Sequence, residues 1–272
     1  MSATSIYCSF FRGLGANVQA YVPHRVREGY GLNEGAVRAL AAEGVKLLVT
    51  SDCGTTSHHE IAVANQLGLD VIVTDHHQTD EQMPPALAVM NPHRREARYP
   101  FRGLCSGGLA YKVADAYRQR YGQGTVALDS LLDLVALSTI ADVVPLQDEN
   151  RGFVQAGLRE LSRGSRCGIR ALKQVAGVTR ECTAETVGFK LGPRLNAAGR
   201  LDHAIKGVQL LTTESEAEAM QLAQELELLN RRRQDLEAEI MQEAVAMLGE
   251  GDAPPAIVPK LAFTTFGYAT PL

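Results

Sequence analysis

LDVIVTDHH (residues 69–77) follows VKLLVTSD (45–52) across one helical pattern, and this pair of runs decides the fold. Both runs are nearly continuous in apolar and β-branched residues, as expected for strands covered on both faces. Between them, apolar residues recur at helical spacing from Ser57, which has Glu60 three residues on as in a capping box, to Gly68. A strand, a helix and a second strand in this order predict a right-handed crossover that leaves the strands parallel and adjacent.

Weaker signals extend this α/β pattern in both directions. VQAYVP (18–23) predicts a further strand before the pair, and ALAVMN (86–91) predicts a short strand after it. From residue 105 onward the periodicity is helical, with short helices expected over 166–211 and one long helix from Thr213 to Leu248 that opens on a Thr213–Glu216 capping box. The expected fold class is α/β, a parallel-sheet domain followed by a helical linker region and a long connecting helix.

Composition limits the classes of protein that fit. The 272 residues correspond to about 1.8 domains of ordinary size. With 45% hydrophobic and 21% charged residues the chain is globular, and a net charge of −4 means that any nucleic-acid binding must come from local patches. The five cysteines are scattered without a CxxC pair, which favours a cytoplasmic protein. No apolar run reaches the ~20 residues of a membrane span, so no membrane partner is expected.

Acids and histidines fall just past the ends of the two main predicted strands. Asp52 follows the first, and Asp75, His76 and His77 follow the second. Open α/β sheets bind ligands at the carboxyl ends of their strands, so these side chains should meet. Carboxylate and imidazole together suit Mn²⁺, Zn²⁺ or Fe²⁺ better than Ca²⁺, and one Asp can bridge two ions. The sequence therefore predicts a two-metal centre, although Asp52 could instead cap the following helix.

Asp142 is a further candidate for the metal centre, and the pair His58 and His59 serves as a comparison outside it. Asp142 follows the strongly apolar run LSTIA and precedes Val-Val-Pro, so a carboxylate emerges from a mostly buried stretch. Such a group favours a metal or a cationic partner, and the alternative is a helix cap. His58 and His59 fall in the first turn of a predicted helix, where we expect them to face solvent.

Five ordered motifs then resemble a known family: PHRVREGYGLNE (23–34), SDCG (51–54), VIVTDHH (71–77), LLDLVALSTIADVVPL (131–146) and GPRLNAAGRLD (192–202). From about residue 5 to about residue 257 the chain resembles the DHH phosphoesterase superfamily, and within it the bacterial RecJ single-strand-specific exonucleases. The resemblance implies a phosphoesterase domain over 1–160, a helical linker over 161–212, a connecting helix over 213–250 and the start of a second domain over 251–272.

The resemblance also implies roles for the candidate residues. Asp52 would bridge the metals, His76 and Asp142 would complete the coordination, Asp75 would orient a ligand, and His77 would meet the scissile phosphate. The implied reaction is 5′-to-3′ hydrolysis of single-stranded DNA with two Mn²⁺ or Mg²⁺ ions, in DNA repair and recombination. The other motifs would contact DNA phosphates through the remaining four residues, although surface ion pairs are the alternative for the arginines: Arg25, Arg194, Asn196 and Arg200.

The family's phosphoesterase domain begins with a strand ending in Asp-x-Asp-Gly, and the match starts after that motif. We therefore expect the chain to be an impaired fragment, lacking that strand, two metal-binding acids and most of a second domain, with little or no nuclease activity. Two alternatives stay open. One is a small-substrate DHH phosphoesterase, an oligoribonuclease or nucleotide phosphatase, and the other is a non-catalytic DNA-binding scaffold.

Overall fold

A three-stranded parallel sheet lies at the centre of the α/β part. The computed structural model describes residues 1–25, 27–122, 126–201 and 203–246. The sheet has the order β1-β2-β3, formed by β1 (Leu47–Val49), β2 (Asp70–Thr74) and β3 (Ala88–Met90). All pairs are parallel, with Leu48 opposite Val71 and Val73 opposite Val89. The predicted adjacent, parallel pair is confirmed, and the short third strand after it is confirmed as well.

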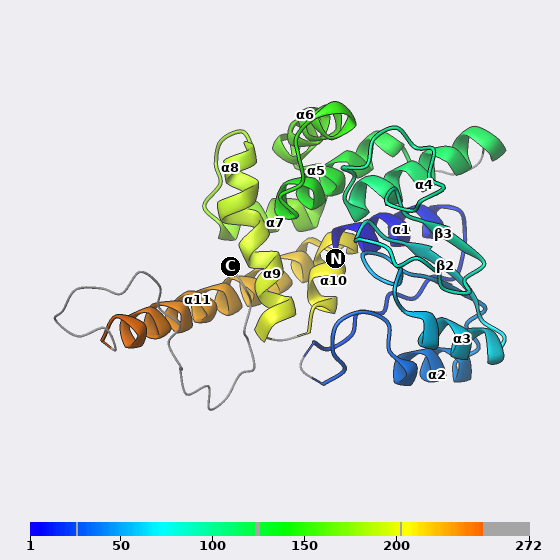
Figure 1. Cartoon of the computed structure of the whole chain (residues 1–272). Coiled ribbons are helices and arrows are strands. Elements are labelled where there is room, and N and C mark those ends of the chain that lie inside the picture. Colours follow the sequence, from blue (N-terminus) through cyan, green and yellow to red (C-terminus); the bar gives the residue numbers. More distant parts are fainter. Residues whose placement is uncertain (26, 123–125, 202, 247–272) are drawn as a thin grey trace.

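Helices cover both faces of this sheet. Figure 1 shows α2 (Glu34–Ala42) and α3 (His58–Gln66) on one side, and α1 (Ser2–Gly13) and α4 (Ser106–Tyr121) on the other. Val71 and Val73 are fully buried in one hydrophobic cluster with Val37 of α2 and Ile61 of α3. Burial of both faces explains why the strands are continuous apolar runs.

The remaining helices pack into a second, larger core. One buried cluster includes Ala3 of α1, Leu134 of α5 and Leu226 of α11, so the helical part shares its core with α1 and α4. In chain order these elements are η1 (Leu128–Leu131), α5 (Leu132–Ala141), α6 (Asp148–Arg163), α7 (Cys167–Val175), α8 (Ala184–Thr186), the π-helical turn η2 (Val187–Leu191), α9 (Gly192–Leu201), α10 (Ile205–Thr212) and α11 (Glu216–Ala246).

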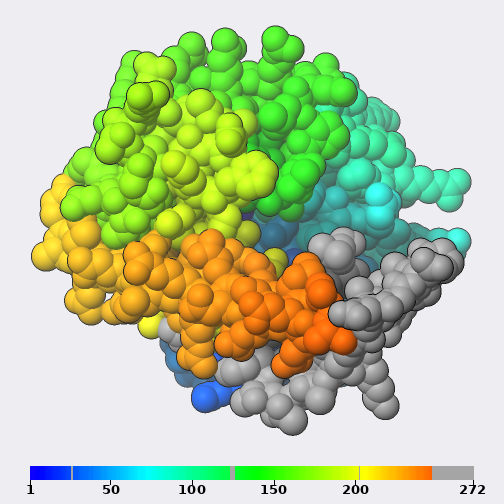
Figure 2. Space-filling view, turned by 90° about the vertical axis from the view of Figure 1, so that its left-hand side faces the viewer, coloured from blue at the N-terminus to red at the C-terminus, as the bar shows by residue number. Residues whose placement is uncertain are grey.

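The long helix α11 is confirmed, but its start differs from the prediction. The Glu218 backbone N–H donates to Ser215 Oγ at 3.3 Å, so Ser215 and Glu218 occupy the positions expected for Thr213 and Glu216. The buried face of α11 lies in its first half, at Ala219, Leu222 and Leu226. Its second half projects beyond the other described elements (Figure 1), and Figure 2 shows the helix lying across one face of the molecule.

Two other predictions about the elements are wrong. VQAYVP forms no strand, because Gln19 and Tyr21 are exposed and the run ends at Pro23, which has no N–H to donate to a sheet. Ser57 is the N-cap residue of α3, but its side chain makes no capping hydrogen bond, so the predicted capping box is not formed. The predicted beginning of a second domain at 251–272 lies outside the described residues.

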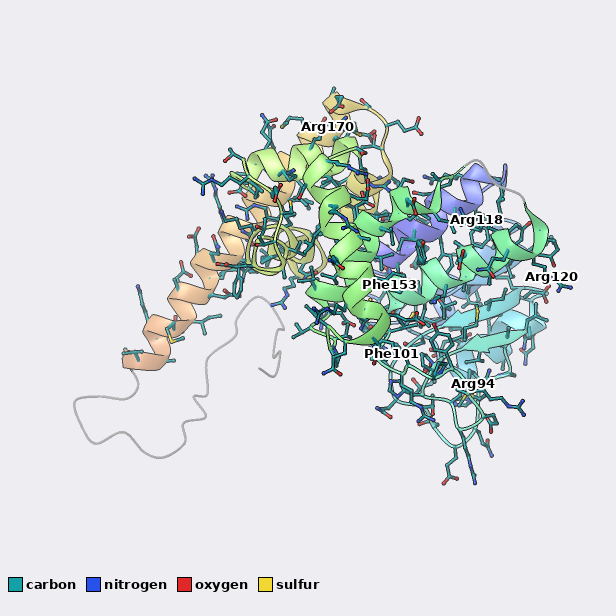
Figure 3. All side chains as sticks on the ribbon, turned by 90° about the horizontal axis from the view of Figure 1, so that it is seen from above. Arg94, Phe101, Arg118, Arg120, Phe153 and Arg170 are labelled. Atoms are coloured by element: carbon teal, nitrogen blue, oxygen red, sulfur yellow. The ribbon has the colours of Figure 1, made fainter. Side chains whose placement is uncertain are left out.

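Four arginines that Figure 3 labels lie on three different parts of the fold. Figure 3 shows Arg94 after β3, Arg118 and Arg120 on α4 and Arg170 on α7, on separate elements. None of the helices in the described ranges combines the length and the apolar character needed to cross a bilayer.

Candidate metal centre

A tight turn after β1 presents Asp52 at the carboxyl edge of the sheet. Asp52 has a φ of 70°, and Gly54 has a φ of 111°, where an added Cβ would lie 2.8 Å from Thr50 Oγ1. The Asp52 N–H donates to the Thr74 carbonyl at 3.0 Å, which ties the turn to the end of β2. The glycine of SDCG is therefore required by both the positive φ and the close approach.

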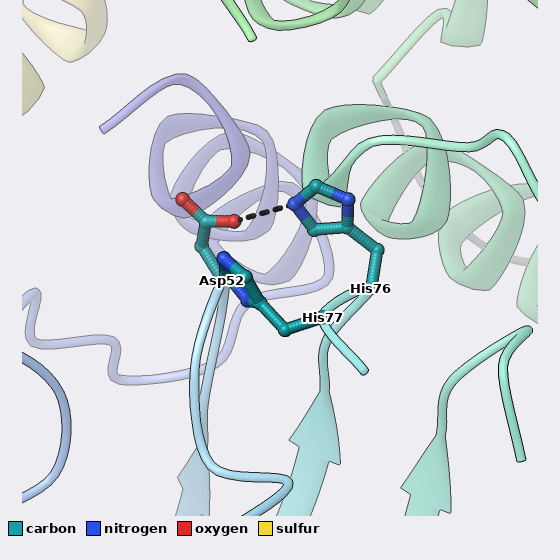
Figure 4. A group of neighbouring side chains, drawn as sticks. All are labelled: Asp52, His76 and His77. Atoms are coloured by element: carbon teal, nitrogen blue, oxygen red, sulfur yellow. Dashed lines mark hydrogen bonds and ion pairs between the residues drawn. The ribbon is translucent and has the colours of Figure 1, made fainter. Parts of the chain in front are cut away.

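Side chains from three elements converge at this edge. His76 Nε2, after β2, lies 3.0 Å from Asp52 Oδ1 and 3.4 Å from Asp142 Oδ2, and Asp142 is the C-cap residue of α5. Asp52, His76 and His77 each offer a ligand atom within 4.8 Å of the others (Figure 4). The structure thus brings together the three predicted metal ligands and places His77 beside them.

Asp75 lies behind the cluster and fixes its second histidine. Its side chain is 3% exposed, and its Oδ1 accepts from His77 Nδ1 at 2.7 Å and from the His76 N–H at 2.8 Å. Asp75 Oδ2 accepts from the Thr55 N–H at 3.1 Å. Because Nδ1 of His77 is engaged, its Nε2 is the ring nitrogen left for a ligand, which is how a buried carboxylate commonly orients a functional histidine.

Two residues that sequence reasoning missed hold Asp52 in place. Ser106 Oγ, at the start of α4, donates to Asp52 Oδ1 at 2.6 Å. Tyr30 OH donates to the Asp52 carbonyl at 2.8 Å. The residue after Ser106 allows a close approach of two helices: a Cβ on Gly107 would lie 2.4 Å from Ser138 Cβ, so this glycine permits close packing of α4 on α5.

The electrostatics of the cluster favour a cation. Burial would lower the pKa of His76, but the hydrogen bond that it donates to Asp52 and the charge of Asp142 raise it overall. Burial would raise the pKa of Asp52, but hydrogen bonds from His76 and Ser106 lower it. The pKa of Asp142 is raised, mainly by burial. The two carboxylates thus make this edge of the sheet a position where positive charge is stabilised.

The donor set of the cluster fits a divalent cation of the Mn²⁺ type. Two carboxylates, of Asp52 and Asp142, each lie in contact with the His76 imidazole, and such mixed oxygen and nitrogen sets bind Mn²⁺, Fe²⁺ or Zn²⁺. The same edge opens into a cavity of ≈ 220 Å³ lined by Asp52, Asp142, Ser106 and Asn196, so a ligand can reach the carboxylates.

The four residues predicted to contact DNA differ in exposure and in the partners they bind. Arg25 and Asn196 are exposed, and Arg200 is half-buried at the end of α9. Arg194 has a side chain that is 14% exposed, and it donates from Nε to Glu227 at 2.5 Å and from Nη1 to the Lys190 carbonyl at 2.7 Å. Most of the Arg194 side chain is thus engaged in the alternative, ion-pair and backbone contacts within the protein, whereas Asn196 lines the cavity that contains Asp52 and Asp142.

Two histidines, His58 and His59, and one cysteine, Cys53, take no part in the candidate metal centre. The His59 side chain is 70% exposed and pairs with Glu34 at 2.9 Å, and His58 lies 3.5 Å from Asp80. His59 faces solvent as predicted, whereas His58 is half-buried. Burial raises the pKa of Cys53 to about 12, with the charges of Asp75 and Asp52 adding to the effect, so this thiol is no nucleophile.

Fold and site together define a parallel α/β domain with a carboxylate–imidazole cation site at the carboxyl edge of its sheet. The profile of the DHH family, N-terminal domain, matches residues 1–139 of the chain. The chain therefore belongs to the DHH family.

Named relatives agree with this assignment. The single-stranded-DNA-specific exonuclease RecJ of Bacillus subtilis (strain 168) is 42% identical over 249 residues, which cover 91% of this chain and 31% of that protein. The RecJ of Escherichia coli (strain K12) is 39% identical, with 90% of this chain and 45% of that protein covered. The chain thus spans about a third to a half of the length of these curated relatives.

Solved structures show the same fold. A crystal structure of exonuclease RecJ bound to manganese aligns with a TM-score of 0.81 and 37% identity, over 90% of this chain and 62% of that one. RecJ from Thermus thermophilus in complex with Mn²⁺ aligns with a TM-score of 0.76 and 34% identity, over 90% and 35% of the two chains. The expected α/β fold class of the family is confirmed.

Proposed function

We propose that the chain carries the phosphodiester-hydrolysing site of a single-strand-specific 5′-to-3′ DNA exonuclease that uses Mn²⁺ or Mg²⁺. The observation that carries the proposal is the position of His76 Nε2 at the sheet edge, 3.0 Å from Asp52 Oδ1 and 3.4 Å from Asp142 Oδ2. The names of the relatives, which are single-stranded-DNA-specific exonucleases, and the manganese in two related structures support it. The unpaired state of all five cysteines favours a cytoplasmic location.

Asp52, His76 and Asp142 would hold the metal. A bound divalent ion would supply positive charge to a phosphate oxygen and would lower the pKa of a water molecule. Ser106 and Tyr30 fix the Asp52 carboxylate and backbone, so this ligand is oriented before any ion arrives. Among the described residues, the cluster offers donors for one ion, and we therefore expect turnover by this chain alone to be slow.

His77 would act on the substrate phosphate. Its Nδ1 is held by the buried Asp75, so Nε2 is the ring nitrogen that would meet a phosphate oxygen. Arg25, Asn196 and Arg200 would hold the DNA strand through its phosphates. The Nη2 group of Arg194 would do the same, since its Nε and Nη1 groups donate to Glu227 and to the Lys190 carbonyl.

The test is hydrolysis of 5′-phosphorylated single-stranded DNA with enzyme in excess and Mn²⁺ present. We expect slow release of nucleotides from the 5′ end, lost on addition of EDTA and lost in Asp52→Ala and His76→Ala. His59→Ala, on an exposed histidine outside the cluster, should cleave at the original rate. The proposal fails if hydrolysis survives both cluster variants, or if no Mn²⁺-dependent hydrolysis occurs at any enzyme concentration.

A further inference from the structure

A second cavity adjoins the candidate metal centre. It has a volume of ≈ 540 Å³, within the range of about 300–1,000 Å³ that is usual for small-ligand pockets. Ala141, Gly192 and Asn196 line both this cavity and the cavity that contains Asp52 and Asp142. The two cavities are therefore adjacent at α9 and the end of α5.

Two exposed apolar side chains flank this second cavity. Phe189 of η2 is 80% exposed, and Val143, directly after Asp142, is 87% exposed. Single exposed apolar residues are ordinary on protein surfaces, but two that face one cavity beside a polar site indicate a ligand groove.

Both side chains are presented by unusual backbone. Phe189 lies in the middle of the π-helical turn Val187–Leu191, and such turns are rare and frequent at functional sites. Val143 has a φ of 56°, a left-handed conformation that a β-branched residue rarely adopts. Strain of this kind persists where the surrounding structure enforces it, and it clusters at ligand clamps. The turn that presents the Asp142 carboxylate to the metal centre also exposes Val143.

The charges around the cavity exclude a phosphate as its ligand. Among the described residues that line it, none is positively charged, and Glu185 is acidic. An aromatic ring, an aliphatic side chain and the Asn196 amide suit a flat heteroaromatic group instead, since the ring can stack and the amide can bond to its edge.

We propose that this cavity, the base pocket, holds a nucleobase of the substrate strand, stacked on Phe189 and bounded by Val143, next to the phosphodiester at the metal centre. The inference rests on the proposed function, because it takes a single-stranded nucleic acid as the substrate. Phe189 is then a binding residue that positions the strand whatever its sequence, because every base has a face that can stack.

The experiment compares the binding of a 5′-phosphorylated oligothymidylate, measured by fluorescence anisotropy in EDTA, between the chain and its variants. Phe189→Ala should weaken binding about tenfold, the size of effect expected when one base loses an aromatic partner. Phe189→Trp should restore it. Tyr121→Ala, which removes a 55% exposed aromatic ring from α4, is the matched control and should bind as the original chain does.

Two further readouts separate stacking from other causes. The slope of log Kd against log salt should be unchanged in Phe189→Ala, because that slope counts neutralised phosphates. An oligonucleotide with abasic sites in place of its 5′-terminal bases should bind the original chain and Phe189→Ala equally.

Several results would overturn the base pocket. Equal binding of thymidylate by the original chain and Phe189→Ala would do so while leaving the proposed function intact. A lower melting temperature of Phe189→Ala with unchanged binding would show instead that the ring packs against protein. Failure of the original chain to bind any single-stranded oligonucleotide would overturn the base pocket and the proposed function together.

Discussion

Asp75 is nearly inaccessible to solvent, and its effect on chemistry must pass through the histidine that it holds. Its carboxylate accepts from His77 Nδ1 and from three backbone N–H groups, those of Thr55, His76 and His77. We expect Asp75→Asn to lower the Mn²⁺-dependent hydrolysis rate about 10- to 100-fold, as is usual when a histidine loses its buried carboxylate partner. The measurement is the single-turnover rate on single-stranded DNA.

A double-mutant cycle tests whether Asp75 acts through His77. If it does, His77→Ala and the double variant should be equally slow, because the second change removes nothing further. Additive losses in the double variant would show that Asp75 acts on its own. Far-ultraviolet circular dichroism of each variant checks that the fold is retained, since Asp75 also bonds the Thr55 backbone.

Some of the cluster could be predicted from sequence and some could not. Asp52 and His76 were predictable as neighbours because parallel strands end at one edge of a sheet. Ser106 and Tyr30 were not, because their bonds to Asp52 span 54 and 22 residues and arise from packing that no local pattern encodes. The role of Arg194 remains a prediction, since its bond to Glu227 depends on how α11 packs against α9.

Among the elements, α6 packs closely against the first half of α5 at Gly157. A Cβ added to Gly157 of α6 would lie 2.2 Å from the Leu132 carbonyl oxygen and 2.5 Å from Ala136 Cβ. We expect Gly157→Ala to reduce the free energy of unfolding by about 1–3 kcal/mol through overpacking. Urea denaturation followed by circular dichroism measures the change.

The same helix provides the control for this substitution. Gly152 is exposed, and a Cβ there would meet nothing within 4 Å. Gly152→Ala should raise the free energy of unfolding by about 0.5–1 kcal/mol, because alanine loses less backbone entropy in a helix. Equal effects of the two substitutions would mean that the close α5–α6 contact is absent.

The elements differed in how well sequence predicted them. The buried strands and long helices were predictable because their apolar periodicity reflects burial. The absence of a strand at VQAYVP was not predictable. A short apolar run that ends in proline has the same pattern whether or not a partner strand lies beside it. The π-turn η2 leaves no distinct pattern either, because one extra residue in a turn hardly alters the spacing of apolar residues.

At the scale of the whole molecule, Arg166 joins three parts of the helical region. It bonds Asp133 of α5 at 3.0 Å, the Leu211 carbonyl of α10 at 3.0 Å and the Ser130 carbonyl of η1 at 3.1 Å. The Asp133 side chain is only 6% exposed. Arg166→Met should therefore cost about 3–5 kcal/mol, because it leaves a buried carboxylate unpaired. The control Arg163→Met, on an exposed pair, should change stability by less than about 1 kcal/mol.

The loss caused by Arg166→Met should depend on pH. Burial raises the pKa of Asp133, and Arg166 opposes that shift, so removal of the arginine raises the pKa further. A native pKa above the unfolded value means that the folded state binds the proton more tightly, so stability falls as pH rises through that interval. The difference between the variant and the original chain should thus shrink from pH 7 towards about pH 4. A difference that stays constant over this range would contradict the burial of an unpaired Asp133.

The domain boundaries at residues 160 and 212 remain predictions. Periodicity separated a sheet region from a helical one, but it could not show that buried residues from Ala3 to Leu226 join one core. That shared core holds α5 against the sheet region, and it thereby brings Asp142 within 3.4 Å of His76.

The binding of Mn²⁺ to the purified chain, measured by isothermal titration calorimetry, tests the metal centre most directly. We expect one ion per chain, lost in Asp52→Asn and retained in His59→Ala, because Asp52 belongs to the cluster and His59 does not. Absence of binding by the original chain, or equal binding by Asp52→Asn, would contradict the assignment of Asp52, His76 and Asp142 as a metal centre.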